Sequence, residues 1–481
     1  MRDYRKMYID GAWVDSAGGQ PLDVINPATE AVAGVITNGS AEDVDRAVKA
    51  ARRAFVSWSR SSRAERIELL SNILAEYQKR SKDLAEAVTE EMGAPAWLAA
   101  QAHVTLGGGH LHTAIEILKT YPFSTDRGET RVLREPIGVC ALITPWNWPL
   151  NQIACKVAPA LSVGCTMVLK PSEIAAFSGH IWTEVMHAAG VPAGVYNMVH
   201  GAGDPVGQAM SAHPGVDMVS FTGSTRAGID IARRAAPTVK RVSQELGGKS
   251  PNLVLDDADF SAAVADGVQT VMRNSGQTCT APTRMLVPAA RMKEAAKIAK
   301  ETAESIVVGD PNGNAMVGPV VSEIQWNKIQ GLIQAGIDEG ATLVAGGTGR
   351  PEGLERGYYV KPTVFVDVNN DMRIAREEIF GPVLSILGFQ DEKQAIEIAN
   401  DTDYGLAAYV QSTNQDHAFE VASQLRAGQV RINNPAFDLM APFGGYKQSG
   451  NGREWGIHGF DEFTEVKAVL GGALAAPVAA E

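Results

Sequence analysis

Cysteine is scarce in this chain of 481 residues, which has only four: Cys140, Cys155, Cys165 and Cys279. They are too few and too scattered for a disulfide framework, and no group of cysteines and histidines has the spacing of metal ligands. We therefore expect a protein of the reducing cytoplasm that holds no metal.

Long hydrophobic runs are missing as well. The N-terminus lacks the apolar stretch of ~7 to 15 residues that a secretory signal needs. The most apolar internal stretch, residues 157–169, lies between two lysines and falls short of the ~20 residues that span a bilayer. This stretch is predicted to be buried core, and neither export nor a membrane partner is expected.

Positive charge is outnumbered. The chain has 43 Lys and Arg against 55 Asp and Glu, a net charge of −12. Such a balance repels a polyphosphate backbone, and no basic patch stands out, so nucleic acid is not an expected partner. What the sequence does have is a globular composition, with 45% apolar and 20% charged residues. Its length suggests about three structural units.

Two patterns divide the chain. Residues 41–92 carry apolar side chains at helical spacing and predict at least two long amphipathic helices. From Gly138, short β-rich runs alternate with helix-like stretches, which indicates βαβ units and a parallel sheet. Strands are predicted at V-C-A-L-I-T, M-V-L-K, V-Y-N-M-V and M-V-S-F-T, and after Gly247 at N-L-V-L, R-M-L-V, T-V-F-V, V-L-S-I-L and A-A-Y-V. We therefore predict two α/β domains.

An extended arm interrupts the first of these domains. Residues 121–136 alternate charges and β-formers, and alone they would make a marginal hairpin. Residues 463–470 are a second β-like segment. A polar arm of this kind is usually stabilised by pairing with another chain, so we predict a homo-oligomer. The last residues, 473–481, are low in complexity and expected to fray.

The stretch N-S-G-Q-T-C-T-A-P-T-R, residues 274–284, places Cys279 after a glycine-containing turn among small polar residues. A thiol attacks only as the thiolate, which needs an electropositive or amide-rich setting. Free cysteines are more often buried and inert, and that is our interpretation of the other three.

The stretch Q-E-L-G-G-K-S-P, residues 244–251, places Glu245 before a Gly-Gly turn. A carboxylate beside a thiol can act as general base for a hydrolytic water if burial raises its pKa. Spacing alone favours a structural glutamate. A Cys-His hydrolase would need a histidine near the thiol; none occurs between His213 and His417, although distance in sequence does not exclude one in space.

Two further stretches follow predicted strands. In I-T-P-W-N-W-P-L, Asn147 could donate its amide to an oxyanion, although Asn in a turn more often caps the backbone. In M-V-L-K-P-S-E, Lys170 and Glu173 lie where open parallel sheets bind their ligands and suit ribose hydroxyls. The alternative there is an ordinary exposed loop.

The stretch V-S-F-T-G-S-T-R-A-G-I-D runs from a strand into a helix whose first turn, with Ser224, could receive a pyrophosphate. The glycines at 201, 203 and 207 do not match G-x-G-x-x-G, so standard Rossmann phosphate binding is not predicted. Residues 377–383 and 441–454 each read alone as loops.

In this order and at these separations, the stretches resemble the NAD(P)-dependent aldehyde dehydrogenase superfamily. The resemblance runs from about Ile9 to Lys467, and its most specific part is the pair E-L-G-G-K-S-P and G-Q-x-C, 34 positions apart. It implies an α/β fold with three parts: a Rossmann-like cofactor domain (1–120 and 138–246), a second α/β catalytic domain (247–462) and a small β oligomerisation arm (121–137 and 463–481). A homodimer or homotetramer is implied.

The resemblance also implies the chemistry. Cys279 matches the nucleophile that forms a thiohemiacetal with an aldehyde, and Asn147 and the Cys279 backbone N–H match the oxyanion donors. Hydride passes to the nicotinamide and leaves a thioester, which water activated by Glu245 hydrolyses. A CoA-acylating enzyme, or a catalytically silent binding or structural protein on this fold, is the alternative. The acylating branch usually lacks the base glutamate, and retention of all three residues argues against a silent protein.

The resemblance implies a cofactor site in which Lys170 and Glu173 contact the adenosine ribose, Ser224 the pyrophosphate, and Glu378 and Phe380 the nicotinamide-ribose side. NAD is expected to be preferred because Glu173 would repel a 2′-phosphate, and Lys170 tempers this, so NADP use is possible. The expected cofactor-binding residues are Ile143, Thr144, Pro145, Trp146, Lys170, Ser172, Glu173, Gly203, Gly207, Phe221, Gly223, Ser224, Leu246, Gly247, Glu378 and Phe380.

The substrate pocket departs from the simple-aldehyde pattern, in which many members carry paired phenylalanines where this chain has Met272 and Arg273. Arg273 resembles the arginine that holds a substrate carboxylate in semialdehyde-acid members, but Cys155 replaces their second arginine. We expect Arg273 to face a surface or interdomain ion pair and the pocket to suit uncharged aldehydes; a carboxylate-bearing aldehyde is the alternative. Residues 433–442 should line the entrance. The expected pocket residues are Trp148, Gln152, Cys155, Met272, Arg273, Phe437 and Phe443.

Overall fold

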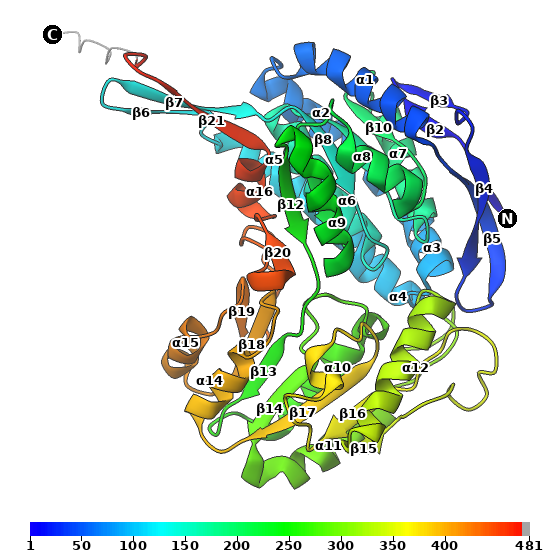
Figure 1. Ribbon diagram of the computed structural model, residues 1–481, viewed down its shortest axis with the longest axis vertical. Helices are drawn as coiled ribbons and strands as arrows, with labels where there is room; N and C mark the ends of the chain where they lie inside the picture. The colour runs from blue at the N-terminus through cyan, green and yellow to red at the C-terminus, as the bar shows by residue number, and fades with distance from the viewer. Residues whose placement is uncertain (474–481) are drawn as a thin grey trace.

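The computed structural model describes residues 1–473, which form two lobes and a projecting arm (Figure 1). Of the C-terminal segment expected to fray, residues 474–481 lie outside the described residues. The first lobe occupies the upper part of Figure 1 and the second lobe the lower part.

An eight-stranded sheet organises the first lobe, in the order β20-β12-β11-β8-β9-β10-β2-β3. Its central strands are parallel and largely buried, as expected for a sheet covered on both faces. They are β8 (Val139–Ile143), β9 (Thr166–Lys170), β10 (Tyr196–Met198), β11 (Met218–Thr222) and β12 (Arg241–Glu245). The edges are antiparallel additions: β20 (Gly450–Asn451), β2 (Met7–Ile9) and β3 (Ala12–Val14).

Helices cover this sheet. The predicted helical region 41–92 contains three helices, two of which begin with capping boxes at Ser40 and Ser62. The third ends at Gly93, whose φ of 74° is a left-handed conformation that favours glycine. The helices of the lobe are α1 (Ala41–Trp58), α2 (Arg63–Lys79), α3 (Ser81–Met92), α4 (Ala96–Leu98), α5 (Thr105–Thr120), α6 (Pro149–Val163), α7 (Ala176–Ala188), α8 (Gln208–Ala212) and α9 (Thr225–Ala235). Helix α6 and the turn after it are wholly buried, so the prediction that residues 157–169 are core is confirmed.

A seven-stranded sheet organises the second lobe, in the order β15-β16-β17-β14-β13-β18-β19. All but the edge strand β15 are parallel. The strands are β13 (Pro251–Val254), β14 (Arg284–Pro288), β15 (Thr342–Ala345), β16 (Thr363–Val366), β17 (Val383–Phe389), β18 (Ala407–Gln411) and β19 (Gln429–Ile432). The main helices are α10 (Phe260–Met272), α11 (Met292–Glu304), α12 (Glu323–Asp338), α14 (Glu392–Asn400) and α15 (Gln415–Ser423). The nine predicted strands are confirmed in both lobes.

The chain returns to the first lobe near its end. Strand β20 pairs with β12, and α16 (Gly456–Glu462) packs on α6. Phe460 and Phe463 are buried in the hydrophobic core of the first lobe, which explains the return. The catalytic domain is predicted to end at residue 462. The segment 450–462, which we call the crossover, already packs on the first lobe before that boundary and connects the two lobes.

The arm is a three-stranded antiparallel sheet of β6 (Ser124–Arg127), β7 (Thr130–Pro136) and β21 (Thr464–Val469). Strand β21 pairs along β7 from Thr464↔Pro136 to Val469↔Arg131, so the two arm segments pair with each other within one chain. The sheet projects from the body of the molecule (Figure 1). A smaller sheet of β1 (Arg2–Tyr4), β5 (Ala31–Asn38) and β4 (Gln20–Asn26) borders the first lobe.

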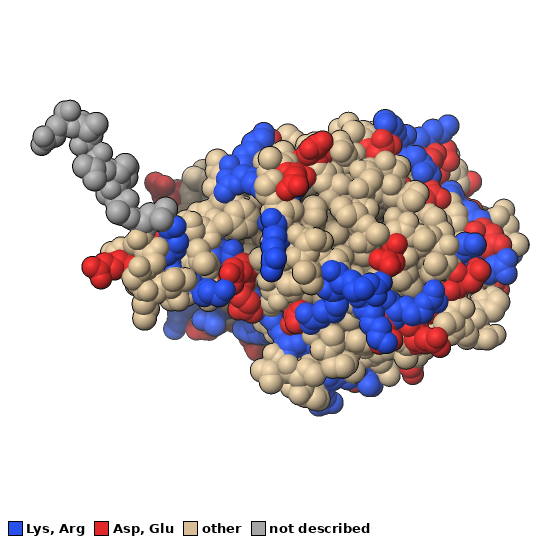
Figure 2. Space-filling model, turned by 90° about the horizontal axis from the view of Figure 1, so that it is seen from above, with Lys and Arg blue, Asp and Glu red and all other residues tan. Residues whose placement is uncertain are grey.

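On the face seen in Figure 2, Lys and Arg side chains lie among Asp and Glu side chains. Within residues 1–473, none of the helices combines the length and hydropathy that crossing a bilayer requires. The same residues contain no cluster of three or more His, Cys, Asp and Glu side chains arranged to ligate a metal.

Candidate active site

Cys279 lies on a cavity of about 680 Å³ at the junction of the two lobes. It follows a turn in which Asn274 and Ser275 have φ values of 54° and 57°, a left-handed conformation uncommon outside glycine. Gly276 continues the turn, and a Cβ there would lie 2.0 Å from the carbonyl oxygen of Gly381. The Cys279 loop is therefore held in one shape by close backbone contacts.

The two most specific motifs of the sequence touch each other here. A Cβ on Gly248 would lie 2.5 Å from the Cys279 carbonyl oxygen, so only glycine lets the two loops approach this closely. The second glycine of E-L-G-G, Gly248, therefore helps to set the position of Cys279.

The Cys279 thiol is protonated in this environment. Burial raises its pKa to about 12, with the carboxylates of Glu378 and Glu245 adding to the effect. The backbone N–H groups of Cys279 and Thr280 lower the pKa of the thiol but do not outweigh burial. A proton acceptor nearby is therefore needed before the sulfur can attack.

Glu245 is a suitable acceptor. It ends strand β12, is 3% exposed, and neither carboxylate oxygen has a hydrogen-bond partner within residues 1–473. Burial and the negative charge of Glu454 raise its pKa well above the usual range, and Lys156 opposes this shift. Gly444 makes room, since a Cβ there would lie 2.8 Å from Glu245 Oε1. The raised pKa makes the Glu245 carboxylate a stronger base than an exposed glutamate.

A buried ion pair lies behind Glu245. Lys156 and Glu454 pair directly, and Lys156 Nζ also donates to Ser220 Oγ at 3.1 Å. The Cys155 thiol donates to Glu454 Oε2 at 3.4 Å. Cys155 is 2% exposed and does not line the cavity, so its expected place in the substrate pocket is wrong. It lies on a buried turn of α6 behind the wall formed by Phe443 and Trp455.

Asn147 lies beside the nucleophile loop. Its Nδ2 donates to the Gln277 carbonyl oxygen at 3.2 Å, which leaves the second amide hydrogen for a ligand. Asn274 Nδ2 in turn donates to the Asn147 carbonyl oxygen at 2.9 Å. The neighbouring Trp148 donates from its indole to Thr278 Oγ1 at 3.0 Å. The Asn147 loop and the Cys279 loop are thus joined by three hydrogen bonds.

The expected cofactor residues gather at one edge of the first sheet. Strands β12, β11, β8 and β9 are neighbours, so their carboxyl ends lie side by side, as in other open parallel sheets that bind ligands. Fourteen of the expected residues lie at the carboxyl ends of these strands, on the loops that follow them, or after the next strand of the sheet, β10: Ile143, Thr144, Pro145, Trp146, Lys170, Ser172, Glu173, Gly203, Gly207, Phe221, Gly223, Ser224, Leu246 and Gly247.

Several polar groups at this edge have hydrogen-bonding capacity that residues 1–473 do not use. The buried hydroxyls of Thr144 and Thr222 have no hydrogen-bond partner within residues 1–473. Ser224 caps α9 by accepting from the Ala227 N–H, which leaves other first-turn N–H groups for an anion. A Cβ on Gly203 would meet nothing within 4 Å, so the space beside it is open. These features fit a dinucleotide.

Lys170 is held more firmly than the sequence suggests. Its Nζ donates to the carbonyl oxygens of Gly201 (2.7 Å) and Pro171 (3.1 Å) and pairs with Glu173 Oε2 at 3.3 Å. All three ammonium hydrogens thus have protein partners. The second carboxylate oxygen of Glu173 forms no hydrogen bond with residues 1–473.

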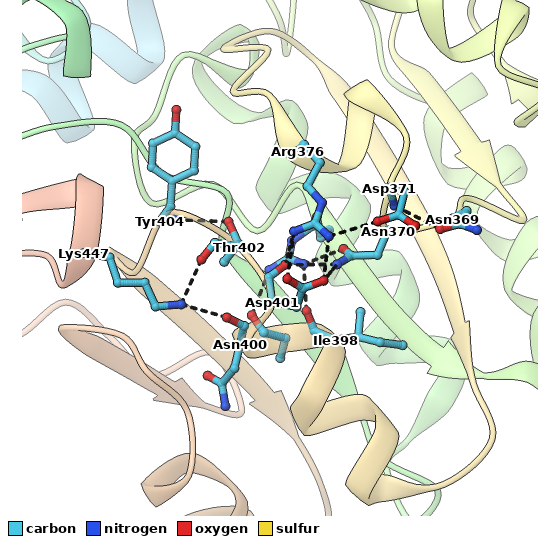
Figure 3. A network of polar contacts seen from close by, with 12 residues as sticks. Asn369, Asn370, Asp371, Arg376, Ile398, Asn400, Asp401, Thr402, Tyr404 and Lys447 are labelled. Carbon is cyan, nitrogen blue, oxygen red and sulfur yellow. Dashed lines mark hydrogen bonds and ion pairs between the residues drawn. The ribbon is translucent and has the colours of Figure 1, made fainter.

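Glu378 and Phe380 belong to the second lobe. Glu378 Oε1 accepts from the Gly248 N–H at 2.9 Å, and the Phe380 ring packs edge-on against Trp146 at 5.4 Å between centroids. Their loop follows α13 (Arg373–Arg376) and is anchored by Arg376, whose Nη2 lies 2.6 Å from Asp401 Oδ2 (Figure 3).

The same network, seen in Figure 3, reaches the segment before the crossover: Lys447 Nζ donates to the carbonyl oxygens of Asn400 (2.7 Å) and Thr402 (2.9 Å). The loop that carries Glu378 and the segment that carries Lys447 are therefore held by the same network of polar contacts.

The cavity that Cys279 lines contains six of the seven residues expected in the substrate pocket: Trp148, Gln152, Met272, Arg273, Phe437 and Phe443. Residues 434–437 of the expected entrance segment line it as well. Arg273 is exposed on the cavity and forms no ion pair with any residue of the described part of the chain, contrary to the expected ion pair. Sequence reasoning missed other lining residues, among them Trp97, Gln101, Asp266, Met316, Tyr409, Arg431 and Trp455. They come from separate elements, and no motif marks them.

Comparison with known proteins agrees with this geometry. Residues 13–469 match the family described as "Aldehyde dehydrogenase family". A 3-succinoylsemialdehyde-pyridine dehydrogenase from Pseudomonas sp. is 56% identical over 473 residues, which is 98% of this chain and 99% of the relative.

Solved structures agree as well. A mutant of aldehyde dehydrogenase C from Pseudomonas syringae, in complex with NAD+ and octanal, is 53% identical, with a TM-score of 0.97 over 98% of each chain. An aldehyde dehydrogenase from Mycobacterium tuberculosis in complex with NAD+ is 39% identical, with a TM-score of 0.95 over 97% of this chain and 98% of that one. Over nearly its whole length, therefore, this chain belongs to the aldehyde dehydrogenase family, and the reaction it carries out is the oxidation of an aldehyde to a carboxylic acid.

Proposed function

We propose that the chain oxidises an extended aldehyde with NAD+, with Cys279 as nucleophile, Asn147 as oxyanion donor and Glu245 as general base. The observation that carries this proposal is the arrangement around Cys279: an unpartnered buried carboxylate within electrostatic reach of the thiol, and an amide with a free hydrogen. A silent protein would have no reason to keep a buried carboxylate without a partner, which is unfavourable.

The reaction begins when Glu245 takes the proton of the Cys279 thiol. The sulfur attacks the aldehyde carbon, and the resulting oxyanion accepts hydrogen bonds from Asn147 Nδ2 and the Cys279 backbone N–H. The chemistry that bound NAD+ supplies is acceptance of a hydride from the carbon held by Cys279. That carbon remains as a thioester.

Hydrolysis of the thioester completes the cycle. Glu245 first passes the thiol proton to solvent and then takes a proton from water. The hydroxide oxygen adds to the thioester carbon, and the C–S bond breaks to release the carboxylic acid and the Cys279 thiolate. Glu245 returns its proton to the sulfur, which restores both groups to their starting state. Burial and the negative charge of Glu454 raise the pKa of Glu245 and so favour proton uptake by its carboxylate, whereas Lys156 opposes this rise.

NAD+ is the proposed cofactor in preference to NADP+. The free oxygen of Glu173 suits a ribose hydroxyl and would repel a 2′-phosphate, whereas Lys170 is neutralised by its own contacts. The cofactor would be held by the loops after β8, β9, β11 and β12, by the first turn of α9, and by Glu378 and Phe380 from the other lobe.

The aldehyde has a mainly apolar body in this proposal. The buried Met272, Phe443 and Trp455 and the half-buried Trp148 line the cavity together with Cys279. The relatives support a long substrate, since one was crystallised with octanal and another is named for a semialdehyde bearing a pyridine ring. The open edge of strand β6 supports assembly into a homodimer or homotetramer, and four free thiols support a reducing cytoplasm.

Trapping the thioester tests the proposal. Glu245→Gln, mixed with octanal and NAD+, should release about one NADH per chain and then nearly stop, because the amide cannot activate water. Intact mass spectrometry should find the octanoyl group on Cys279. Cys279→Ala should give neither product, while Cys140→Ala, with its thiol in the core, serves as the matched control.

Full steady-state turnover by Glu245→Gln would remove it from the mechanism. An octanoyl group on another residue would remove Cys279. Faster release of octanoyl-CoA than of octanoate in the presence of CoA would favour the acylating alternative.

A further inference from the structure

The cavity that holds Cys279 has two ends of different character. Its buried part is lined by Met272, Phe443 and Trp455. Its outer part includes the exposed side chains of Arg273, Asp266 and Phe437, the last 53% exposed, and the half-buried Arg431. A substrate that fills the cavity therefore presents its aldehyde to an apolar end and its other end to charged groups.

Arg431 is built into the wall of the cavity. It lies on β19, where its register partner on β18 is Tyr409, so the two side chains belong to neighbouring positions of the sheet. Tyr409 reaches toward the nucleophile, since its hydroxyl donates to the Thr280 carbonyl oxygen at 3.0 Å. Arg431 is thus one strand away from a residue that contacts the Cys279 loop.

The guanidinium of Arg431 is held in a fixed plane. Its Cζ lies 4.2 Å from the Phe437 ring centroid and 5.7 Å from that of Tyr409. Its Nε and Nη2 both donate to Gln429 Oε1, at 3.3 and 3.1 Å. Stacking and a forked bond to one oxygen fix the orientation of an arginine before a ligand arrives.

This fixed group has unused donors. Nη1 of Arg431 forms no hydrogen bond with residues 1–473, and neither Arg431 nor Arg273 has an acidic partner there. The buried Arg284, by contrast, has its donors used within the chain, since it donates to four carbonyl or amide oxygens. Arg431 and Arg273 both line the cavity and leave guanidinium donors for an acceptor on the substrate.

We propose that Arg431 is a specificity-determining residue that binds a planar oxygen acceptor, a carboxylate or a ketone, at the end of the substrate remote from the aldehyde. Arg273 adds a second positive charge on the same cavity. The planar edge of the Arg431 fork matches the plane of such a group, and Phe437 covers its face. The inference rests on the proposed function, because it assumes that the aldehyde lies at Cys279.

Kinetics with three aldehydes of similar length test the proposal: an n-alkanal, an ω-carboxyaldehyde and an aryl ketone bearing the aldehyde on a short chain. The wild-type enzyme should favour one or both acceptor-bearing aldehydes over the alkanal. Arg431→Met should reduce that ratio of kcat/KM ~10- to 100-fold, mainly through KM, because a charge-assisted hydrogen bond is lost.

Arg431→Lys identifies the acceptor. A lysine keeps the charge but not the planar fork. It should therefore restore kcat/KM for the carboxyaldehyde more than kcat/KM for the ketone. Arg291→Met is the matched control, since Arg291 also stacks on an aromatic ring, Phe260, at 3.6 Å but does not line the cavity. Its substrate ratios should equal those of the wild type. Thermal unfolding of each variant checks that it is folded. If Arg431→Met does not fold, Arg431→Gln replaces it in the comparison.

Unchanged ratios in a folded Arg431 variant, or no wild-type preference for either acceptor-bearing aldehyde, would overturn the inference. Either result leaves alkanal oxidation, and with it the proposed function, intact. Failure of the wild-type enzyme to oxidise any of the three aldehydes would count against the proposed function instead.

Discussion

The Cys279 carbonyl oxygen and Gly248 are in such close contact that a Cβ on the glycine would lie 2.5 Å from that oxygen. The contact joins the loop that follows Glu245, the proposed base, to the loop of Cys279, the proposed nucleophile. It also explains why a small residue is needed at a position whose own chemistry is inert.

Gly248→Ala should therefore damage catalysis more than folding. The added methyl group must push the Cys279 backbone away, and shifts of this kind in packed regions cost about 1 to 3 kcal/mol. We expect kcat to fall at least ~10-fold, because the thiol and the oxyanion site move together. Steady-state kinetics and urea unfolding of the same preparation measure both effects.

Gly331→Ala is the matched control, since an added Cβ there meets nothing within 4 Å in helix α12. It should leave kcat unchanged and stabilise the helix by roughly 0.5 to 1 kcal/mol. Equal kinetics for the two variants would show that the Gly248 contact does not position Cys279.

Stability should depend on pH through Glu245. Its pKa is raised in the folded protein above the ordinary value of about 4.3, so the folded state holds this proton more tightly than the unfolded state. The resulting stability is present below pH ~4.3 and is lost as the pH rises through the folded pKa. Glu245→Gln lacks this loss and should gain stability relative to the wild type between pH 5 and 8. Urea unfolding at pH 5 and at pH 8 measures the effect. An equal change in the free energy of unfolding of the wild type and of Glu245→Gln between these two pH values would contradict the raised pKa of Glu245.

His103 should have the opposite effect on acidification. It stacks on Trp148 at 4.1 Å between centroids, and burial lowers its pKa to about 3, opposed by its contact with Asn274. The unfolded chain takes up this proton near pH 6.5, so the wild type loses stability as the pH falls below that value.

His103→Phe keeps the stacking surface but cannot be protonated, so its free energy of unfolding should fall less between pH 7 and 4 than that of the wild type. The slope removed is at most ~1.4 kcal/mol per pH unit. Chemical unfolding followed by tryptophan fluorescence measures it. A wild-type slope in the variant would mean that His103 is not buried as a neutral ring.

Cofactor choice should depend on Glu173. Glu173→Gln removes the charge that repels a 2′-phosphate and frees Lys170 from its ion pair. The ratio of kcat/KM for NAD+ to that for NADP+ should fall ~10- to 100-fold, as expected for a local charge effect of this size. Glu68→Gln, at an exposed position of α2, is the control. An unchanged ratio would show that Glu173 does not face the 2′ position.

The sequence by itself determined the regular elements and the close-contact loops. Strands such as Val139–Ile143 are short apolar runs bounded by turn residues, and α1 and α2 carry their own caps at Ser40 and Ser62. These signals are local, because backbone conformation depends on neighbouring residues and on period-two or helical patterns of burial. Strand β12 was less visible, since R-V-S-Q-E alternates weakly and is stabilised by its neighbours β11 and β20.

Only the tertiary structure decided which side chains meet. Cys155 is one layer behind the cavity because α6 turns it toward Glu454, and Arg431 enters the cavity because β19 lies beside β18. The arm pairs within the chain because the backbones of β7 and β21 complete one sheet, and residues 450–462 return to the first lobe because Phe460 is buried in its core. A cavity wall is assembled from elements separated by hundreds of residues, and the spacing of residues along one chain does not specify the angles at which those elements pack.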